Sequence, residues 1–406
     1  MKNKSKTKIL YIGPIPPEIG GQSAGGIATH AWQLATQAYK RGYDVYILAN
    51  TSSSFTKDGV KVLNPPKKNK LLKAFYGFNF WLTINKSELN KLNFLSFKEK
   101  VSVIYNAYLL KIILNSINPD LVHIHSLYNI ITLSFNIIPS PTPLIITNNE
   151  FYYKNIGEKK KDIAIANCGL SIANYIICVS KYAKNQLEKS GLNYHGKLKV
   201  INIPIDSSKI PLLEKKEIKK KIGLAGKKII LFIGVFKPIE KKGLDILLKA
   251  FCISPYLLKK CKLIVISNAE GVKYTKFFIE KKSIDVLALQ NKSWTEIVDY
   301  YNASDIFVMP SRSEGFGIVY TEALLANTPV IGFHKIINEL ENIFGIYIGE
   351  KFDANKEDEK DLAKKIIKVL NMNFKRGLLR RKVIETLSWD VKFQEFDSVY
   401  REVLEK

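Results

Sequence analysis

Short apolar runs alternate with stretches of helical periodicity along almost the whole chain, and this alternation constrains the fold more than any other feature. Buried strands are predicted at 8–13, 44–49, 120–125, 143–147, 175–179, 197–202, 228–234, 261–267, 284–287, 305–309 and 329–332. Helices are predicted at 27–40, 97–117, 243–252, 294–302, 317–326, 360–370 and 391–405. A strand, a helix and a second strand form a βαβ unit, which builds a parallel sheet covered by helices. Two successive series of such units predict an α/β fold with two doubly wound domains.

The length of 406 residues also favours two domains, because it exceeds what one hydrophobic core usually supports. A charged segment at 214–221 lies near the junction of the two series, and we place the boundary close to residue 205. The prediction is an N-terminal domain at 1–204, a C-terminal domain at 205–387 and a final segment at 388–406. We expect the helix of this last segment to cross back to the N-terminal domain.

The chain carries 62 Lys and Arg against 37 Asp and Glu, a formal net charge of +25. Such a charge favours anionic partners, namely nucleotide phosphates, acidic lipid headgroups or nucleic acid. The sequence has no helix-turn-helix, RNA-binding sheet motif or zinc pattern, so no nucleic-acid partner is expected. Compositional drift is an alternative explanation for part of the lysine excess.

The cysteine usage and the apolar segments both indicate a cytoplasmic protein. The four cysteines show no Cys-x-x-Cys spacing, which predicts free thiols in a reducing compartment. The basic N-terminus is followed only by a short apolar run that already contains proline, which argues against a signal peptide. The longest uncharged stretch, 121–149, contains three prolines, which argues against a membrane span.

The segment 67–100 combines positive charge with aromatic residues. It has eight lysines against two glutamates, and seven aromatic side chains lie among them. This composition suits peripheral attachment to an anionic membrane surface, which needs both apolar and cationic contributions. The alternative is that the aromatic side chains form the core of an inserted hairpin or helix pair.

Two glutamates eight positions apart, Glu314 and Glu322, carry most of the functional information. Glu314 lies in a glycine loop after the predicted strand 305–309, and Glu322 lies in the helix that follows. An open α/β sheet binds ligands at this place, beyond the carboxyl ends of its strands. The helix N-terminus suits a phosphate, and carboxylates suit the hydroxyls of a sugar. The loop therefore predicts a nucleotide-sugar site; the alternative for Glu322 is an ordinary exposed helix position.

A second motif joins a glycine to two lysines. The predicted strand 228–234 ends at Gly234, where a missing side chain permits close approach of a ligand, and Lys241 and Lys242 precede the next helix. Lysines at this place can clamp a diphosphate. Transfer of a sugar from a nucleotide sugar expels a nucleoside diphosphate, and fixed cations stabilise the charge that grows on its oxygens. The alternative is that Lys241 and Lys242 are two solvent-exposed surface lysines that bind no ligand.

The remaining candidates lie in the first half of the chain. The first βαβ unit has glycine pairs in its loop but no Gly-x-Gly-x-x-Gly, so NAD is not predicted. His123 and His125 share one face of a strand, which allows a metal pair. Because no third ligand is evident, we favour a hydrogen-bonding role at the rim of the site. For His30, on the first helix, a packing role is expected.

These residues, in this order, resemble the retaining glycosyltransferases of family four, the group-one glycosyltransferases. The resemblance rests on stretches along nearly the whole chain: Gly25–Gly26, 120–125, 173–180, Gly234 with 242–245, 314–317 with Glu322, and 388–390 leading to Tyr400. It implies the GT-B fold, in which two Rossmann-like domains face each other across a cleft. It also implies a nucleoside diphosphate sugar as one substrate and a glycan as the other.

The resemblance implies a role for each matching residue. Glu314 would bind the hydroxyls of the donor sugar, Lys242 would neutralise the diphosphate, and Glu322 would bind the ribose. The remaining donor contacts would come from Gly26 and from the backbone N–H groups of Gly315, Phe316 and Gly317. No protein nucleophile is expected, so Glu314 and Lys242 are interpreted as groups that stabilise the transition state. The sequence contains no Asp-x-Asp, and neither a metal nor another cofactor is expected.

Two departures from the family pattern leave alternatives open. Val235 follows Gly234 where many relatives have arginine, so either Lys237 or Lys241 substitutes for it or a phosphate contact is lost. Asn149 stands where relatives often have histidine, and it cannot take a proton at neutral pH. His125 and Asn149 are the candidates on the acceptor side.

The predicted function is transfer of a sugar to a glycan acceptor, lipid-linked and in surface polysaccharide assembly, with retention of configuration. The alternative is a catalytically impaired protein of the same fold that binds nucleotide sugars.

Overall fold

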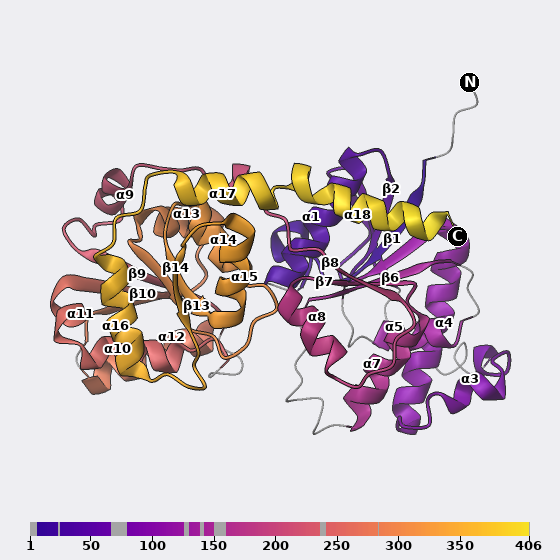
Figure 1. Ribbon diagram of the computed structural model, residues 1–406. Coiled ribbons are helices and arrows are strands. Elements are labelled where there is room, and N and C mark those ends of the chain that lie inside the picture. Colours follow the sequence, from indigo (N-terminus) through magenta and orange to yellow (C-terminus); the bar gives the residue numbers. More distant parts are fainter. Residues whose placement is uncertain are drawn as a thin grey trace. The chain divides into compact units, whose positions relative to one another are not determined.

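The computed structural model describes residues 6–22, 25–65, 79–125, 130–138, 142–149, 160–235, 241–282 and 284–405. The chain divides into two units, each with its own sheet and helices (Figure 1). Unit 1 comprises Met1–Asn202 and Phe393–Lys406, and unit 2 comprises Ile203–Lys392. The C-terminal residues thus belong to the unit that contains the N-terminus.

The sheet of unit 1 has the strand order β3-β4-β2-β1-β5-β6-β7-β8. Its strands are β1 (Lys8–Ile12), β2 (Asp44–Leu48), β3 (Phe55–Lys57), β4 (Val60–Leu63), β5 (Leu121–Ile124), β6 (Leu144–Asn148), β7 (Tyr175–Cys178) and β8 (Lys197–Val200). All neighbouring strands are parallel except the β3–β4 hairpin. The central strands are apolar on both faces because helices cover both. The strand order reverses between β1 and β5, so a ligand site is expected beyond their carboxyl ends.

The helices of unit 1 include the C-terminal helix of the chain. They are α1 (Gly26–Lys40), α3 (Lys86–Asn90), α4 (Phe97–Ile117), α5 (Ile130–Asn136), α7 (Lys160–Ile172), α8 (Lys181–Glu188) and, from Phe393 onward, α18 (Trp389–Leu404). A capping box of Ser96 and Glu99 starts α4. Helix α18 lies beside α1 (Figure 1), where the Phe396 ring packs 6.1 Å from that of His30. Phe396 and Tyr400 are fully buried, so apolar burial holds this helix on unit 1.

The sheet of unit 2 is entirely parallel and has the order β11-β10-β9-β12-β13-β14. Its strands are β9 (Lys228–Ile233), β10 (Cys261–Ile266), β11 (Val286–Leu289), β12 (Ile306–Met309), β13 (Val330–Phe333) and β14 (Gly349–Phe352). Its helices are α9 (Lys215–Lys221), α10 (Leu244–Ile253), α11 (Pro255–Lys260), α12 (Ala269–Lys282), α13 (Trp294–Ala303), α14 (Ile318–Leu325), α15 (His334–Phe344), α16 (Glu359–Leu370) and α17 (Leu378–Leu387). The strand order reverses between β9 and β12. The loops after these two strands therefore meet at the ligand-binding edge of the sheet.

Two strands of unit 2 differ from the sequence prediction. The strand predicted at 284–287 is observed two residues later, as β11 (Val286–Leu289), and Val286 N–H at its start donates to Ile284 O at 3.1 Å. Strand β14 was not predicted, since its sequence Gly-Glu-Lys-Phe lacks a strand-like apolar pattern. It pairs with β13 because residue 349 is glycine: a Cβ there would lie 1.9 Å from Val330 O.

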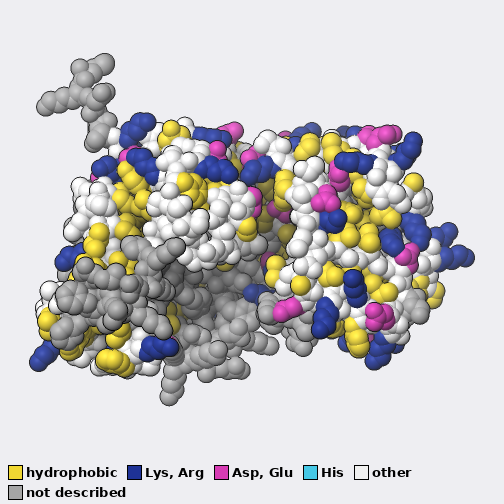
Figure 2. Space-filling view, turned by 180° about the vertical axis from the view of Figure 1, so that it is seen from behind, with side chains coloured by type: hydrophobic (Ala, Val, Ile, Leu, Met, Phe, Trp, Pro, Cys, Tyr) yellow, Lys and Arg dark blue, Asp and Glu magenta, His cyan; other side chains and the backbone are white. Residues whose placement is uncertain are grey.

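Charged side chains, cysteines and apolar helices are the features that the composition led us to examine. Figure 2 shows Lys and Arg side chains at many separate places on the face that it presents. All four cysteines, each in a described position, are free. Among the described residues, no helix has the length and apolar character needed to cross a membrane.

The basic and aromatic segment 67–100 is described only from residue 79 onward. Phe80 is buried and its ring lies 5.8 Å from that of Tyr108, as the interpretation of an inserted core expects. In contrast, Trp81 is 43% exposed and Phe97 is 83% exposed. The segment therefore contributes aromatic side chains both to packing and to the surface.

Candidate functional site

In unit 2, the loop after β9 and the loop after β12 touch each other at the carboxyl edge of the sheet. Arg312 N–H donates to Lys241 O at 2.9 Å. Gly243 has φ +74°, and a Cβ on it would lie 2.1 Å from Pro310 O. A residue with a side chain would force the two loops apart, so glycine at this position allows the contact.

This contact brings Lys242 and Glu314 together. Lys242 Nζ lies 2.8 Å from Glu314 Oε1 and 2.6 Å from Glu314 Oε2. The Glu314 side chain is 10% exposed and the Lys242 side chain is 25% exposed. Because water is largely excluded from the carboxylate, this ion pair is stronger than one on an open surface. A cation and a carboxylate are thus held at the predicted site, 72 positions apart in sequence.

A second ion pair supports the same two loops. The Arg312 guanidinium donates from both terminal nitrogens to the two Asp245 oxygens, at 3.0 and 2.8 Å. This two-point geometry fixes orientation as well as distance. No role was predicted for Arg312 from the sequence. The only available signal was its position two residues before Glu314.

The glycine loop is held in place by a buried tyrosine. Gly317 has φ +73°, and a Cβ there would lie 2.5 Å from the Tyr320 ring. Tyr320 OH donates to Met309 O at 2.8 Å and accepts from Phe333 N–H at 3.1 Å. Phe316 is buried, so this side chain anchors the loop. The first N–H groups of α14 begin at this loop, which gives it the positive end of a helix dipole.

Glu322, on α14, is partly buried and bound to a tyrosine, so it is not an ordinary exposed helix residue. Tyr301 OH donates to Glu322 Oε2 at 2.7 Å, and Tyr301 itself is fully buried. Burial raises the pKa of Glu322 to about 7, although the hydrogen bond from Tyr301 lowers it. Glu314 and Glu322 therefore have different partners: a cation for the first and a neutral hydroxyl for the second.

The other donor-side candidates differ in how they are placed. A Cβ on Gly234 would lie 3.1 Å from the Phe232 ring and 3.7 Å from Lys242 Cγ, so glycine leaves room for the lysine. Lys241 contributes its carbonyl oxygen to the loop contact. Val235 is half exposed. Lys237 lies outside the described residues.

In unit 1, the corresponding edge of the sheet carries buried histidines. His125 follows β5, next to Gly13 at the end of β1, where a Cβ would lie 3.0 Å from His125 Cβ. Neither ring nitrogen of His125 has a hydrogen-bond partner within the described residues. Its ring stacks on that of His123 at 4.6 Å. Burial, with smaller contributions from His123 and His30, holds the pKa of His125 well below its usual value, so the imidazole is neutral.

His123 belongs to a buried chain of hydrogen bonds. Its Nδ1 lies 2.9 Å from Tyr400 OH, and its Nε2 lies 2.7 Å from Thr147 Oγ1. Tyr400 OH in turn lies 3.0 Å from Tyr11 OH. Burial lowers the pKa of His123 to about 3, which keeps the ring neutral and able to act as both donor and acceptor.

His30 and Asn149 complete this edge. His30 is buried, as the predicted packing role requires, and its Nδ1 also lies 3.4 Å from Asn149 Oδ1. Burial lowers the pKa of His30 to about 4. Gly26 is the first residue of α1 and is exposed. Across the described ranges, no group of three or more His, Cys, Asp or Glu side chains is arranged to hold a metal ion.

Two family models match this chain. The one described as Glycosyltransferase Family 4 matches residues 24–209, and the one described as Glycosyl transferases group 1 matches residues 214–386. The second match contains Lys242, Glu314 and Glu322. The chain belongs to the family 4, group 1 glycosyltransferases.

Relatives within this family match part of the chain. A glycosyltransferase of Methanocaldococcus jannaschii is 29% identical over 237 residues, which are 56% of this chain and 59% of that protein. The capsular polysaccharide biosynthesis glycosyltransferase CapM of Staphylococcus aureus is 25% identical over 246 residues, 58% of this chain and 63% of that protein. The chain thus spans about three fifths of the length of these relatives.

Solved structures of similar fold cover almost all of the chain. Sucrose-phosphate synthase from Thermosynechococcus elongatus has a TM-score of 0.74 at 15% identity and covers 98% of this chain and 100% of its own. Anabaena HepE, in complex with UDP and glucose, has a TM-score of 0.67 at 16% identity with the same coverage. Likeness at such identity shows the fold alone. The predicted GT-B fold with two doubly wound α/β domains is confirmed.

The structure gathers most of the donor-side candidates of this family member in unit 2. Lys242 and Glu314 are in direct contact, residues 315–317 continue the same loop, and Glu322 lies on the helix after it. Gly26, His125 and Asn149 lie in unit 1. Their roles toward a substrate remain predictions.

Proposed function

We propose that this family member is a retaining glycosyltransferase that moves a sugar from a nucleoside diphosphate sugar to a glycan acceptor without a metal ion. The observation that carries the proposal is the ion pair of Lys242 with Glu314. It lies at the topological reversal of the unit 2 sheet, beside the N-terminus of α14. A cation, a carboxylate and a helix dipole at one edge suit a sugar joined to a diphosphate.

In the proposed reaction, the bond between the sugar's anomeric carbon and the diphosphate oxygen breaks while the acceptor oxygen bonds to the same face of that carbon. The acceptor's proton passes to the departing phosphate. Lys242 stabilises the charge that grows on this phosphate. The Glu314 carboxylate accepts hydrogen bonds from the sugar hydroxyls and thereby fixes the sugar's orientation.

We assign the ribose of the donor to Glu322. An ionised carboxylate accepts hydrogen bonds from both hydroxyls of a diol, whereas a protonated one must use one oxygen as a donor. Since the pKa of Glu322 is about 7 without ligand, we expect donor binding to release part of a proton near neutral pH.

We assign the acceptor side to His125 and Asn149 in unit 1. Both ring nitrogens of His125 are buried and have no hydrogen-bond partner in the described part of the chain. Asn149 Nδ2 is also buried there without a partner. Buried polar atoms without partners are uncommon and suit a site that a polar ligand completes. CapM, a relative in capsular polysaccharide biosynthesis, supports a glycan acceptor in surface polysaccharide assembly.

We further propose that the acceptor is lipid-linked and that the protein works at the cytoplasmic face of a membrane. The exposed aromatic rings of Trp81 and Phe97 lie in the basic segment 67–100, and such rings with lysines favour an anionic lipid surface. Flotation with anionic liposomes tests this. Binding should fall in high salt and after replacement of the lysines in this segment by glutamine, and binding that responds to neither change would refute it.

The decisive test of the enzymatic proposal is the variant Glu314→Gln, which removes one charge and keeps the shape. Hydrolysis and transfer should be measured with UDP- and GDP-sugars. We expect a loss of turnover of about 100-fold or more, because a transition-state contact is removed. The matched control is Glu341→Gln, which breaks a similar ion pair with Lys351 (2.8 Å) on another part of unit 2. Equal turnover in the two variants would refute the assignment of Glu314.

The alternative, a protein that binds nucleotide sugars without transferring them, rests on Val235 and Asn149. The same assay separates the two proposals when it is combined with a binding measurement. Saturable UDP-sugar binding with neither hydrolysis nor transfer by the unmodified chain would favour the alternative.

A further inference from the structure

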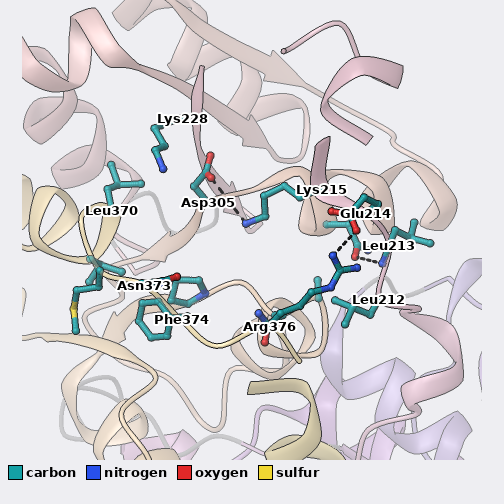
Figure 3. Close-up of a pocket in the computed structure, with 16 residues that line it drawn as sticks. Leu212, Leu213, Glu214, Lys215, Lys228, Asp305, Leu370, Asn373, Phe374 and Arg376 are labelled. Atoms are coloured by element: carbon teal, nitrogen blue, oxygen red, sulfur yellow. Dashed lines mark hydrogen bonds and ion pairs between the residues drawn. The ribbon is translucent and has the colours of Figure 1, made fainter. Parts of the chain in front are cut away.

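Unit 2 contains a pocket at the opposite edge of its sheet from the proposed donor site (Figure 3). Lys228, the first residue of β9, lines it, whereas Gly234 and the donor loops follow the other end of that strand. Asp305 and Pro329, which come just before β12 and β13, line it as well. All strands of this sheet are parallel, so their amino ends share one edge. The pocket is therefore separate from the donor site.

Positive charge exceeds negative charge around this pocket. Three cations, Lys215, Lys228 and Arg376, line it together with two carboxylates, Glu214 and Asp305. Arg376 and Glu214 form an ion pair with each other. One carboxylate, that of Asp305, thus remains to offset two lysines.

The remaining carboxylate, Asp305, is shared by several donors, and Lys215 is one of them. Asp305 Oδ2 accepts hydrogen bonds from Lys219 Nζ at 2.6 Å and from Ile229 N–H at 2.7 Å. Lys215 Nζ donates to Ser304 O at 2.5 Å and lies 3.9 Å from Asp305 Oδ1. Within the described residues, Lys228 Nζ has no hydrogen bond or ion pair. An anion in the pocket would offset the charge of Lys228, which is an exposed residue, and the part of the Lys215 charge that the shared Asp305 carboxylate leaves.

The opposite wall is apolar and aromatic. Figure 3 shows Leu370 and Phe374 across the pocket from Lys215 and Asp305. The Phe374 ring stacks on that of Tyr347, with centroids 6.1 Å apart and planes 13° from parallel. A ligand that fits both walls needs an anionic group at one end and a ring or apolar body at the other.

The size of the pocket limits the ligand further. Its volume is about 280 Å³, slightly below the ~300–1,000 Å³ common for ligand pockets. A nucleoside diphosphate sugar is too large for this space, whereas a single sugar ring with one phosphate fits it. Lys215 and Lys219 share the single Asp305 carboxylate, and Lys228 has no ion pair among the described residues, so positive charge remains in excess here. A phosphate monoester near neutral pH carries close to two negative charges and would offset this excess.

We propose that this pocket binds a small phosphate monoester, with its phosphate between Lys215 and Lys228 and its body against Phe374. The site goes beyond the proposed transferase activity. Because it lies at the other edge of the sheet, its ligand and the donor can be bound at the same time.

Calorimetric titration at low ionic strength tests the proposal, with glucose 6-phosphate and inorganic phosphate as probes. We expect saturable binding of glucose 6-phosphate and weaker binding of inorganic phosphate, which lacks the ring. Lys228→Gln should weaken glucose 6-phosphate binding by about 10- to 100-fold, as expected for loss of a hydrogen bond to a charged group. The matched control is Lys227→Gln, because Lys227 is the neighbouring lysine but pairs with Asp285 at 2.9 Å and does not line the pocket. It should leave binding unchanged.

The variant Lys242→Gln separates this site from the donor site, whose lysine could also hold a phosphate. Glucose 6-phosphate binding should survive in this variant, and UDP binding should survive in Lys228→Gln. Binding lost with Lys242→Gln but kept with Lys228→Gln would overturn the proposal, and so would the absence of saturable binding. Vesicles that contain phosphatidic acid test whether the bound phosphate belongs instead to a lipid headgroup. Capture that depends on Lys228, without binding of glucose 6-phosphate, would overturn the proposed small ligand and assign the pocket to the phosphate of a lipid headgroup.

Discussion

Glu322 makes the stability of unit 2 depend on pH in a way that one substitution can isolate. Its pKa is raised from 4.5 to about 7 in the folded chain, chiefly by burial. A raised pKa means that the folded state disfavours the charged form. The stability is therefore complete below the unfolded pKa and is lost as the pH rises through about 7. The loss amounts to about 3 kcal/mol at most, since one pKa unit corresponds to ~1.4 kcal/mol.

The variant Glu322→Gln keeps the shape of the side chain and the acceptor for Tyr301 OH but cannot ionise. We compare the free energies of unfolding of the variant and the unmodified chain in urea, at about pH 4.5 and at about pH 8. The variant's stability relative to the unmodified chain should rise by about 3 kcal/mol between these pH values. All other titrating groups cancel in this difference.

The matched control is Glu350→Gln. Burial raises the pKa of Glu350, but hydrogen bonds from Lys368 and Tyr347 more than offset this, and its pKa is lowered. A lowered pKa contributes stability that is lost only in acid, so this control should stay flat between about pH 4.5 and pH 8. If the stability difference between Glu322→Gln and the unmodified chain is also the same at both pH values, the conclusion that Glu322 is held in a water-poor site is refuted.

Two further substitutions test contacts on which each unit depends. Gly243→Ala places a Cβ 2.1 Å from Pro310 O at φ +74° and should destabilise unit 2 by about 2–4 kcal/mol. The control is Gly226→Ala, at φ +83°, where a Cβ would have no atom within 4 Å; it should cost only about 1 kcal/mol. Thermal unfolding compares the two variants, and equal decreases in the melting temperature would contradict the loop contact. Tyr400→Phe removes the hydroxyl that Tyr11 OH and His123 Nδ1 share as a hydrogen-bond partner in unit 1. It should lower the free energy of unfolding in urea by about 1–3 kcal/mol. The exposed control Tyr39→Phe should cost almost nothing, and a neutral Tyr400→Phe would show that the hydroxyl carries no net stability.

Much of the architecture could be predicted because its signals are local. Helix α4 was predicted with its observed bounds, since its residues form one continuous stretch of chain that ends just before Pro119. The capping box at its start was seen only in the structure. The glycine loop with Glu314 was predicted at the carboxyl end of a strand because Pro310 and Gly317 mark its limits. Strand β14 escaped prediction because its pairing depends on a glycine that faces another strand, not on its own residues.

The amino-acid sequence by itself determined the alternation of strands and helices, the place of Glu314 and the lysines in loops after strands, the place of Glu322 in the following helix, and the family. Tertiary structure alone decided which of these groups meet. Lys242 and Glu314 are 72 positions apart, and they touch because β9 and β12 pair and Gly243 lets their loops approach. Tyr11 and Tyr400, 389 positions apart, share a hydrogen bond because α18 packs on unit 1. Local periodicity sets an element's type, whereas such contacts depend on strand order and close packing between distant segments.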